Sequence, residues 1–275
     1  MGKPISVIIT TYNRPKDVND AIGSLLIQTV KPFEIIVIDD GSQPPLGTRF
    51  QSEEVKQIRF DQEVGLSNAR NYGISLVEDG YIAFLDDDAI ADRNWLEEVR
   101  KGIDEADILG GPIRPIYQVP PPKWWNEKVF GFCAGVGNWT NGEIWGMNLV
   151  VRKEVFRAVG LFNPNIGRQK EKLLSFEEID FIDRAQKSGF RVRFMPLAVV
   201  YHKVASKRMT LAYILRWNYY AGKSKKAQHG YRPSRTCRSI LMCILDMINP
   251  QIITSEKSTR IRKIAWMVAL LGELF

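Results

Sequence analysis

Residues 81–88, Tyr-Ile-Ala-Phe-Leu-Asp-Asp-Asp, place a short apolar and aromatic run directly before three adjacent carboxylates. Such a run is typical of a buried strand, and ligands of α/β sheets bind at the edge where strands end. Adjacent acids repel one another unless they are solvated or neutralised, and their oxygens suit Mg²⁺ or Mn²⁺. A strand that continued through Asp86 and Asp88 would place both carboxylates on one side. The triplet is also compatible with an acidic surface turn.

Around this stretch, strand-like and helix-like segments alternate. Residues 5–10, 34–38 and 55–60 have the apolar character of strands, and helical patterns begin near residues 14 and 65. Regular alternation predicts a parallel α/β sheet with right-handed crossovers. The first strand-to-helix turn lacks the glycine pattern of a dinucleotide fold, and no phosphate-binding P-loop follows. A nucleotide bound here is therefore not held by a glycine cradle.

Composition indicates a soluble globular chain. Its 275 residues, 45% hydrophobic, suffice for a full core. The three cysteines do not form a disulfide framework, and the N-terminal run lacks the pattern of a signal peptide. We therefore expect a cytoplasmic protein.

The charge is unevenly distributed. Residues 203–275 contain 14 Lys and Arg but 3 Asp and Glu, whereas residues 1–202 contain 24 and 28. Aromatic residues interleave with the basic ones, and apolar clusters occupy 240–248 and 264–275. Three interpretations remain: a nucleic-acid surface, amphipathic helices on an anionic membrane, or a solvated helical cap. No nucleic-acid motif accompanies the charge, so the membrane surface is the predicted partner and nucleic acid is not. Neither apolar cluster is long enough to span a bilayer.

Several ordered motifs between roughly residues 4 and 203 resemble those of family 2 glycosyltransferases, inverting enzymes with the GT-A fold. They are Val-Ile-Ile-Thr-Thr-Tyr-Asn-Arg at 7–14, Ile-Val-Ile-Asp-Asp-Gly-Ser at 36–42, Gly-Leu-Ser-Asn-Ala-Arg-Asn-Tyr-Gly at 65–73, Leu-Asp-Asp-Asp at 85–88, Gly-Met-Asn at 146–148 followed by Arg152, and Glu-Glu-Ile-Asp at 177–180. The resemblance implies a Rossmann-like, mostly parallel sheet flanked by helices. It implies a catalytic domain at 1–205, with a nucleotide-binding half at 1–90 and an acceptor-binding half at 91–205. A basic amphipathic helical region at 206–275 would follow.

The same resemblance implies a donor site. Asp88 is the first metal ligand, joined by Asp86 and His202, with Mn²⁺ or Mg²⁺ as the cofactor. The donor nucleotide would contact Thr10, Tyr12, Arg14, Asp40, Arg70, Asp86 and Asp87, and the donor sugar or acceptor would contact Gly146 and Asn148.

Side-chain chemistry fits these roles but leaves alternatives. Asp40 can accept from a base N–H, Tyr12 can stack on the base and Thr10 offers a hydroxyl, yet turn capping and core packing explain the same residues. Arg70 could reach the phosphates or bridge the acids, or form a surface ion pair. A lone histidine at a strand end, such as His202, is often structural.

An inverting transfer needs a base that takes the proton of the acceptor hydroxyl. Glu178 matches the position of the family's base, although the family usually has Asp there, and Glu177 and Asp180 are the alternatives. The same three acids would also stabilise a helix N-terminus without any catalytic role.

The sequence thus predicts a metal-dependent inverting glycosyltransferase at the cytoplasmic face of the membrane. The donor would be a UDP-sugar first and a GDP-sugar second, and the acceptor a lipid-linked or growing glycan in surface polysaccharide or glycoconjugate synthesis. Two alternatives remain: a non-catalytic glycan- or nucleotide-binding partner subunit, and a nucleotidyltransferase. The acidic motifs argue against the first, and the absence of a Gly-rich basic first loop argues against the second.

Overall fold

The computed structural model describes residues 3–47, 53–137, 142–169, 172–229 and 257–274. The chain divides into two compact units. The first comprises Met1–Pro115, Asn138–Pro164 and Glu177–Lys203, and the second Ile116–Gly137, Asn165–Phe176 and Val204–Phe275. The C-terminal segment thus shares its unit with two segments from the middle of the chain, and the predicted division into a catalytic domain at 1–205 and a helical region at 206–275 stays a prediction.

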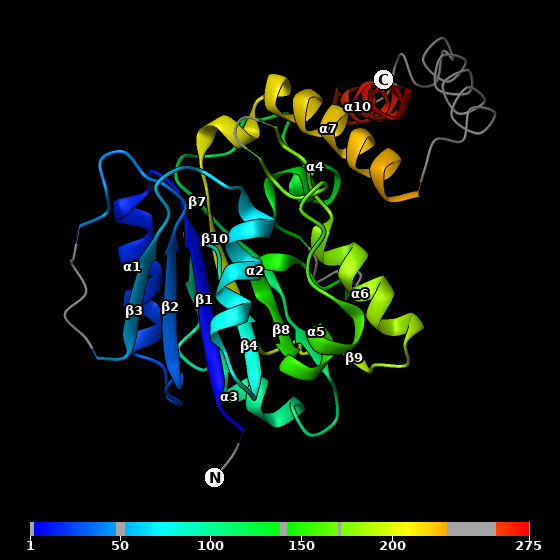
Figure 1. Cartoon of the computed structure of the whole chain (residues 1–275). Coiled ribbons are helices and arrows are strands. Elements are labelled where there is room, and N and C mark those ends of the chain that lie inside the picture. Colours follow the sequence, from blue (N-terminus) through cyan, green and yellow to red (C-terminus); the bar gives the residue numbers. More distant parts are fainter. Residues whose placement is uncertain (1–2, 48–52, 138–141, 170–171, 230–256, 275) are drawn as a thin grey trace. The chain divides into compact units, whose positions relative to one another are not determined.

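A seven-stranded sheet forms the centre of the first unit, in the order β3-β2-β1-β4-β8-β6-β9 (Figure 1). Neighbouring strands are parallel except where β8 pairs with β4 and β6. This arrangement confirms the predicted α/β class and mostly parallel sheet. The strands are β1 (Ile5–Thr11), β2 (Glu34–Asp39), β3 (Val55–Arg59), β4 (Tyr81–Phe84), β6 (Ile108–Gly110), β8 (Leu149–Arg152) and β9 (Val192–Phe194).

Helices flank this sheet because successive strand side chains point to opposite faces. Ile8, Ile82 and Phe84 pack on one face with residues of α2 (Leu66–Leu76), α5 (Lys153–Val159) and α6 (Glu177–Lys187). The remaining helices of this unit are α1 (Pro15–Leu26) and α3 (Trp95–Gly102). The Tyr81 hydroxyl donates to the carbonyls of Ile103 and Ala106, just after α3.

A smaller sheet has the order β5-β10-β7, formed by β5 (Ala89–Ala91), β10 (Val200–Val204) and β7 (Ile113–Tyr117). The antiparallel pairing of β10 with β5 sets His202 opposite Ala89. Because Ala89 directly follows the acidic triplet, this register brings a histidine from a distant segment to Asp88.

One strand expectation needs correction. β4 ends at Phe84, and Asp87 and Asp88 lie in a turn that the Ala89 amide closes by donating to the Asp86 carbonyl at 3.1 Å. The carboxylates are therefore arranged by a turn, not by strand alternation. Strand β8 begins at Leu149, directly after Gly146–Asn148, which forms a 3₁₀ turn.

The second unit contains α4 (Glu127–Ala134), α7 (Leu211–His229) and α10 (Lys257–Leu274). A C-terminal helical region is therefore present, as predicted. The apolar cluster at 240–248 lies outside the described residues. In the part of the chain that the structure describes, no helix combines the length and apolar character that crossing a membrane requires.

Candidate active site

The acidic turn after β4 contacts the end of β1, the parallel neighbour of β4. Thr11, the last residue of β1, donates its hydroxyl to Asp87 Oδ2 at 2.8 Å. Arg14 follows three residues later and extends Nη1 to Asp87 Oδ1 and Asp88 Oδ2, each at 2.8 Å. Asp87 and Asp88 are both buried. This end of the site is therefore a buried pair of acids neutralised by one guanidinium.

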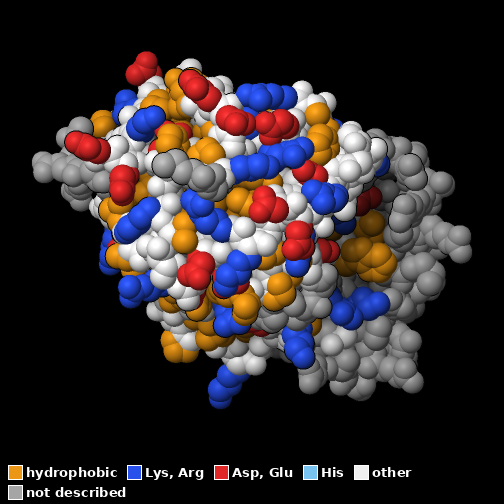
Figure 2. Space-filling view, turned by 90° about the horizontal axis from the view of Figure 1, so that it is seen from below, with side chains coloured by type: hydrophobic (Ala, Val, Ile, Leu, Met, Phe, Trp, Pro, Cys, Tyr) orange, Lys and Arg blue, Asp and Glu red, His pale blue; other side chains and the backbone are white. Residues whose placement is uncertain are grey.

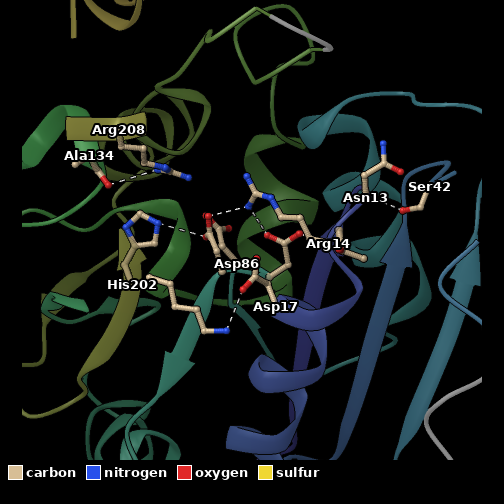
Figure 3. A network of polar contacts seen from close by, with 12 residues as sticks. Asn13, Arg14, Asp17, Ser42, Asp86, Ala134, His202 and Arg208 are labelled. Carbon is tan, nitrogen blue, oxygen red and sulfur yellow. Dashed lines mark hydrogen bonds and ion pairs between the residues drawn. The ribbon is translucent and has the colours of Figure 1, made fainter. Parts of the chain in front are cut away.

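His202 approaches the acids from the side opposite Arg14, as Figure 3 shows. Its side chain is fully buried, and Nε2 lies 3.4 Å from Asp88 Oδ1. Neither ring nitrogen makes a hydrogen bond. On β10, the next residue, Lys203, donates its amide to the Asp88 carbonyl at 2.9 Å and pairs its ammonium with Asp17 and Asp20 of α1. These contacts hold the histidine beside the acidic turn.

Arg70 of α2 connects the acidic turn to α6. Its Nη2 lies 2.7 Å from Asp86 Oδ1, and its Nη1 lies 2.9 Å from Glu177 Oε1. Both Arg70 and Glu177 are buried. The guanidinium also faces the rings of Phe84 and Phe162, at 5.7 and 6.0 Å from their centroids. Arg70 is thus a buried bridge between two acids, which excludes the alternative of a surface ion pair.

The acids at the start of α6 have different environments. Burial, followed by the charge of Glu177, raises the pKa of Glu178 to about 7, and the Gly146 amide and Arg70 oppose the shift. Asp180 accepts from Arg184 Nε one helical turn later, at 3.0 Å. The raised pKa of Glu178 suits proton transfer near neutral pH.

Three of the predicted nucleotide contacts, Thr10, Tyr12 and Asp40, lie at the ends of β1 and β2. Tyr12 is 42% exposed, which leaves its ring accessible for stacking. Thr10 is partly exposed. Asp40 is buried, and its two oxygens accept from the amides of Val64 and Gly65 at 2.7 and 3.0 Å. Asp40 therefore fixes the turn before α2, and recognition of a base by it stays a prediction.

Gly146 and Asn148 have structural roles in the observed packing. A Cβ added at Gly146 would lie 2.8 Å from Arg70 Nη1, so glycine leaves room for the guanidinium. Asn148 is fully buried; it accepts from Trp95 Nε1 at 2.9 Å and donates to the Ala198 carbonyl at 2.8 Å. Their predicted contacts with a sugar remain untested.

The chemistry of the site suits a divalent cation, although the predicted ligands do not all meet. Asp88 and His202 offer a carboxylate and a buried imidazole with unpartnered nitrogens at close range, a set that Mn²⁺ accepts well. Asp86 instead faces Arg70. Among the described residues, no three His, Cys, Asp or Glu side chains form a group that would hold a metal.

Two contributors to this region were missed by sequence reasoning. The hydroxyl of Thr11 holds Asp87, and Arg59 of β3 lies 3.6 Å from the fully buried Asp39 at the end of β2. A Thr at a strand end beside predicted site residues is a usable signal for the first contact. The second depends on β2–β3 register, which pairs Asp39 with Arg59.

Comparison with known proteins identifies the family. The family model described as "Glycosyl transferase family 2" matches residues 6–160, more than half of the chain. The chain belongs to glycosyltransferase family 2. It is 26% identical over 240 residues to the glucosyl-dolichyl phosphate glucuronosyltransferase of Haloferax volcanii, covering 81% of this chain and 76% of that protein. It is also 26% identical to the succinoglycan biosynthesis protein ExoM of Rhizobium meliloti over 237 residues, covering 80% and 73%.

A solved structure supports the fold of this glycosyltransferase. The crystal structure of GalNAc-T7 with UDP, GalNAc and Mn²⁺ matches with a TM-score of 0.60 at 17% sequence identity. The match covers 82% of this chain and 51% of that one, so the chain spans about half of that longer protein. At this identity the likeness concerns the GT-A-type fold. The family match and the named relatives show that the protein is a glycosyltransferase enzyme related to proteins of polysaccharide and glycoconjugate synthesis.

Proposed function

We propose that this glycosyltransferase is metal-dependent and inverting, and that it transfers a sugar from a nucleoside diphosphate donor to a hydroxyl of a lipid-linked or growing glycan. The observation that carries the proposal is the connected set of acids and arginines in the first unit. Asp88 with His202 lies at one end, and Glu178 lies beyond the Arg70–Glu177 pair at the other. Opposite ends of one site thus offer a cation site for the leaving diphosphate and a base for the acceptor.

In the proposed reaction, the Glu178 carboxylate removes the proton of the acceptor hydroxyl while that oxygen forms a bond to the anomeric carbon. The bond from the anomeric carbon to the diphosphate oxygen breaks, and its electron pair leaves with the nucleoside diphosphate. Attack from the face opposite the leaving group inverts the anomeric centre. A divalent cation held by Asp88 and His202 would neutralise the charge on the departing diphosphate.

The proposed donor is a UDP-sugar, with a GDP-sugar second. The exposed ring of Tyr12 and the partly exposed Thr10 support a nucleoside at the end of β1. The crystal structure of GalNAc-T7 holds UDP and Mn²⁺, which supports a UDP-sugar as the proposed donor and Mn²⁺ as the proposed cation for this chain. The dolichyl phosphate in the name of the Haloferax volcanii relative supports a lipid-linked acceptor. We therefore place the proposed reaction at the cytoplasmic face of a membrane, in agreement with the cysteine pattern and the basic C-terminal region.

A binding screen followed by a transfer assay tests the proposal. UDP-, GDP- and dTDP-sugars are added with and without Mn²⁺, and the thermal midpoint is measured, because a ligand of the folded state raises it. We expect the largest rise with a UDP-sugar and Mn²⁺ together. Release of nucleoside diphosphate is then measured for the wild type and Asp88→Asn.

The matched control is Asp61→Asn, which neutralises a fully exposed carboxylate near the end of β3. We expect Asp88→Asn to lose donor turnover with an unchanged circular dichroism spectrum, and Asp61→Asn to retain it. Full turnover by Asp88→Asn, or turnover that chelation of divalent cations leaves unchanged, contradicts metal dependence.

A further inference from the structure

Arg14 is the counter-ion of the acidic turn. A single nitrogen, Nη1, lies 2.8 Å from Asp87 and 2.8 Å from Asp88. Asp88 is contacted from both sides, because its Oδ2 faces Arg14 and its Oδ1 faces His202 Nε2 at 3.4 Å (Figure 3). The guanidinium therefore shares Asp88 with the imidazole proposed to hold a metal.

The backbone that carries Arg14 is fixed, whereas its side chain is accessible. The Asn13 amide donates to Ser42 Oγ at 2.8 Å, and the Gln43 amide donates to Asn13 Oδ1 at 2.7 Å. Pro15, the first residue of α1, restricts the chain on the other side. The Arg14 side chain is 33% exposed, while those of Asp87 and Asp88 are 8% and 9% exposed. The guanidinium is thus the most exposed member of this group of charges.

The acids need a cation. Asp87 and Asp88 are both buried, and the same Arg14 nitrogen lies 2.8 Å from each of them. Two adjacent buried carboxylates without a positive partner would be strongly unfavourable, because each desolvated charge is stabilised only by an opposite one. Some cation, either from the chain or from solution, must therefore occupy this position when both acids are ionised.

We infer that Arg14 occupies this position in the unliganded protein and that a divalent cation must displace it from Asp88 in order to bind. The inference rests on the proposed metal dependence and adds a competition to it. The displaced guanidinium would then be free to pair with the donor diphosphate, an anion that suits its forked donors. The cation and the donor should therefore bind cooperatively, because each favours the displaced position of Arg14.

Binding of Mn²⁺ alone, in the absence of any nucleotide, tests the competition directly. Free Mn²⁺ is followed by electron paramagnetic resonance at fixed ionic strength for wild type, Arg14→Met and Arg14→Lys. We expect Arg14→Met to bind Mn²⁺ about tenfold more tightly than wild type, since the metal no longer displaces a charge-assisted pair. Arg14→Lys, which keeps the charge but loses the planar fork, should fall between the two.

The matched control is Arg152→Met. Arg152 pairs with the buried Asp107 at 3.1 Å and is 30% exposed, yet it lies outside the acidic turn. Its substitution removes the same side chain and charge, so unchanged Mn²⁺ affinity in this variant would assign the effect to Arg14. Thermal midpoints add a second measurement: Arg14→Met should be less stable than wild type without metal, and Mn²⁺ should raise its midpoint more.

The outcomes separate this inference from the proposed function. Equal or weaker Mn²⁺ binding by Arg14→Met, while the wild type binds the ion, overturns the competition and leaves metal dependence intact. Failure of every variant to bind Mn²⁺ overturns this inference, whereas the effect of chelation on donor turnover decides the metal dependence separately. If Arg14→Met does not fold, the comparison of Arg14→Lys with wild type decides, and equal affinity there overturns the inference.

Discussion

Three carboxyl groups begin α6, and their neighbours give each a different chemistry. Glu177 accepts from Arg70, and Asp180 pairs with Arg184 on the next turn of the helix. Burial and the neighbouring charge of Glu177 instead destabilise the carboxylate of Glu178. The pKa of Glu178 is therefore higher than that of an ordinary glutamate. Chemically similar acids in one helical turn are thereby distinguished by packing.

The pH dependence of sugar transfer should follow the protonation of the Glu178 carboxylate. The base acts as the carboxylate, so activity is present above its pKa, which burial raises to about 7, and falls as the pH drops through this value. We expect kcat/KM of the wild type to rise along an acidic limb near this pH. Glu178→Gln should lower kcat about 10²- to 10⁴-fold and abolish that limb. An unchanged limb in Glu178→Gln would assign it to another group.

Removal of Arg70 should cost stability as well as activity. Arg70→Met leaves the buried Glu177 without the partner at 2.9 Å, and breaking a buried pair costs about 3–5 kcal/mol. Urea denaturation measures the free energy of unfolding. Arg193→Met is the control, because its pair with Glu105 is exposed and should contribute at most about 1 kcal/mol. Equal losses in the two variants would argue against a buried bridge.

Among the elements, α7 and α10 of the second unit pack closely through glycine. A Cβ added at Gly222 would lie 1.8 Å from the Ala269 carbonyl oxygen, and one at Gly272 would lie 1.9 Å from the Tyr219 carbonyl oxygen. The two glycines thus let each helix approach the backbone of the other. A larger residue at either position must separate the helices.

Two glycine-to-alanine substitutions in helices should therefore have opposite effects. Gly222→Ala must move backbone atoms and should lower the free energy of unfolding by about 1–3 kcal/mol. Gly23→Ala in α1 meets nothing within 4 Å and should raise it by up to about 1 kcal/mol, because alanine is the better helix former. Chemical denaturation of both variants checks the signs. Stabilisation by Gly222→Ala would contradict the close packing.

Over the whole molecule, the net charge of +7 conceals an uneven distribution, because the basic residues are concentrated in the C-terminal part of the chain. The face in Figure 2 carries basic and acidic side chains in close alternation, which does not favour binding of a polyanion. Residues 203–275, by contrast, contain 14 Lys and Arg and 3 Asp and Glu. On α10, Trp266 is 45% and Ile264 is 38% exposed, so apolar side chains accompany the charges. This combination favours the proposed contact with an anionic membrane.

Cosedimentation with lipid vesicles tests this contact. We expect binding to vesicles that contain anionic lipid, weaker binding to neutral vesicles, and release as salt is raised. Lys225 and Arg262 are exposed on α7 and α10, and replacing both by Gln should weaken binding about 30-fold, at about 1 kcal/mol per charge. Leu197→Ala removes an apolar residue that is 68% exposed in the first unit and should have no effect. Binding to neutral vesicles that salt does not weaken would contradict an electrostatic contact.

The amino-acid sequence determined the fold class, the positions of most strands and helices, and the family, because apolar periodicity and ordered motifs are local properties of the chain. It also marked the acids at 86–88 and 177–180 and the histidine at 202. Which side chains meet was decided only by the tertiary structure. Arg14 and Asp88 are 74 positions apart, and Arg70 and Glu177 are 107 apart. Strand register and helix packing bring such residues together, and the same packing buried Asn148 and gave Glu178 its raised pKa.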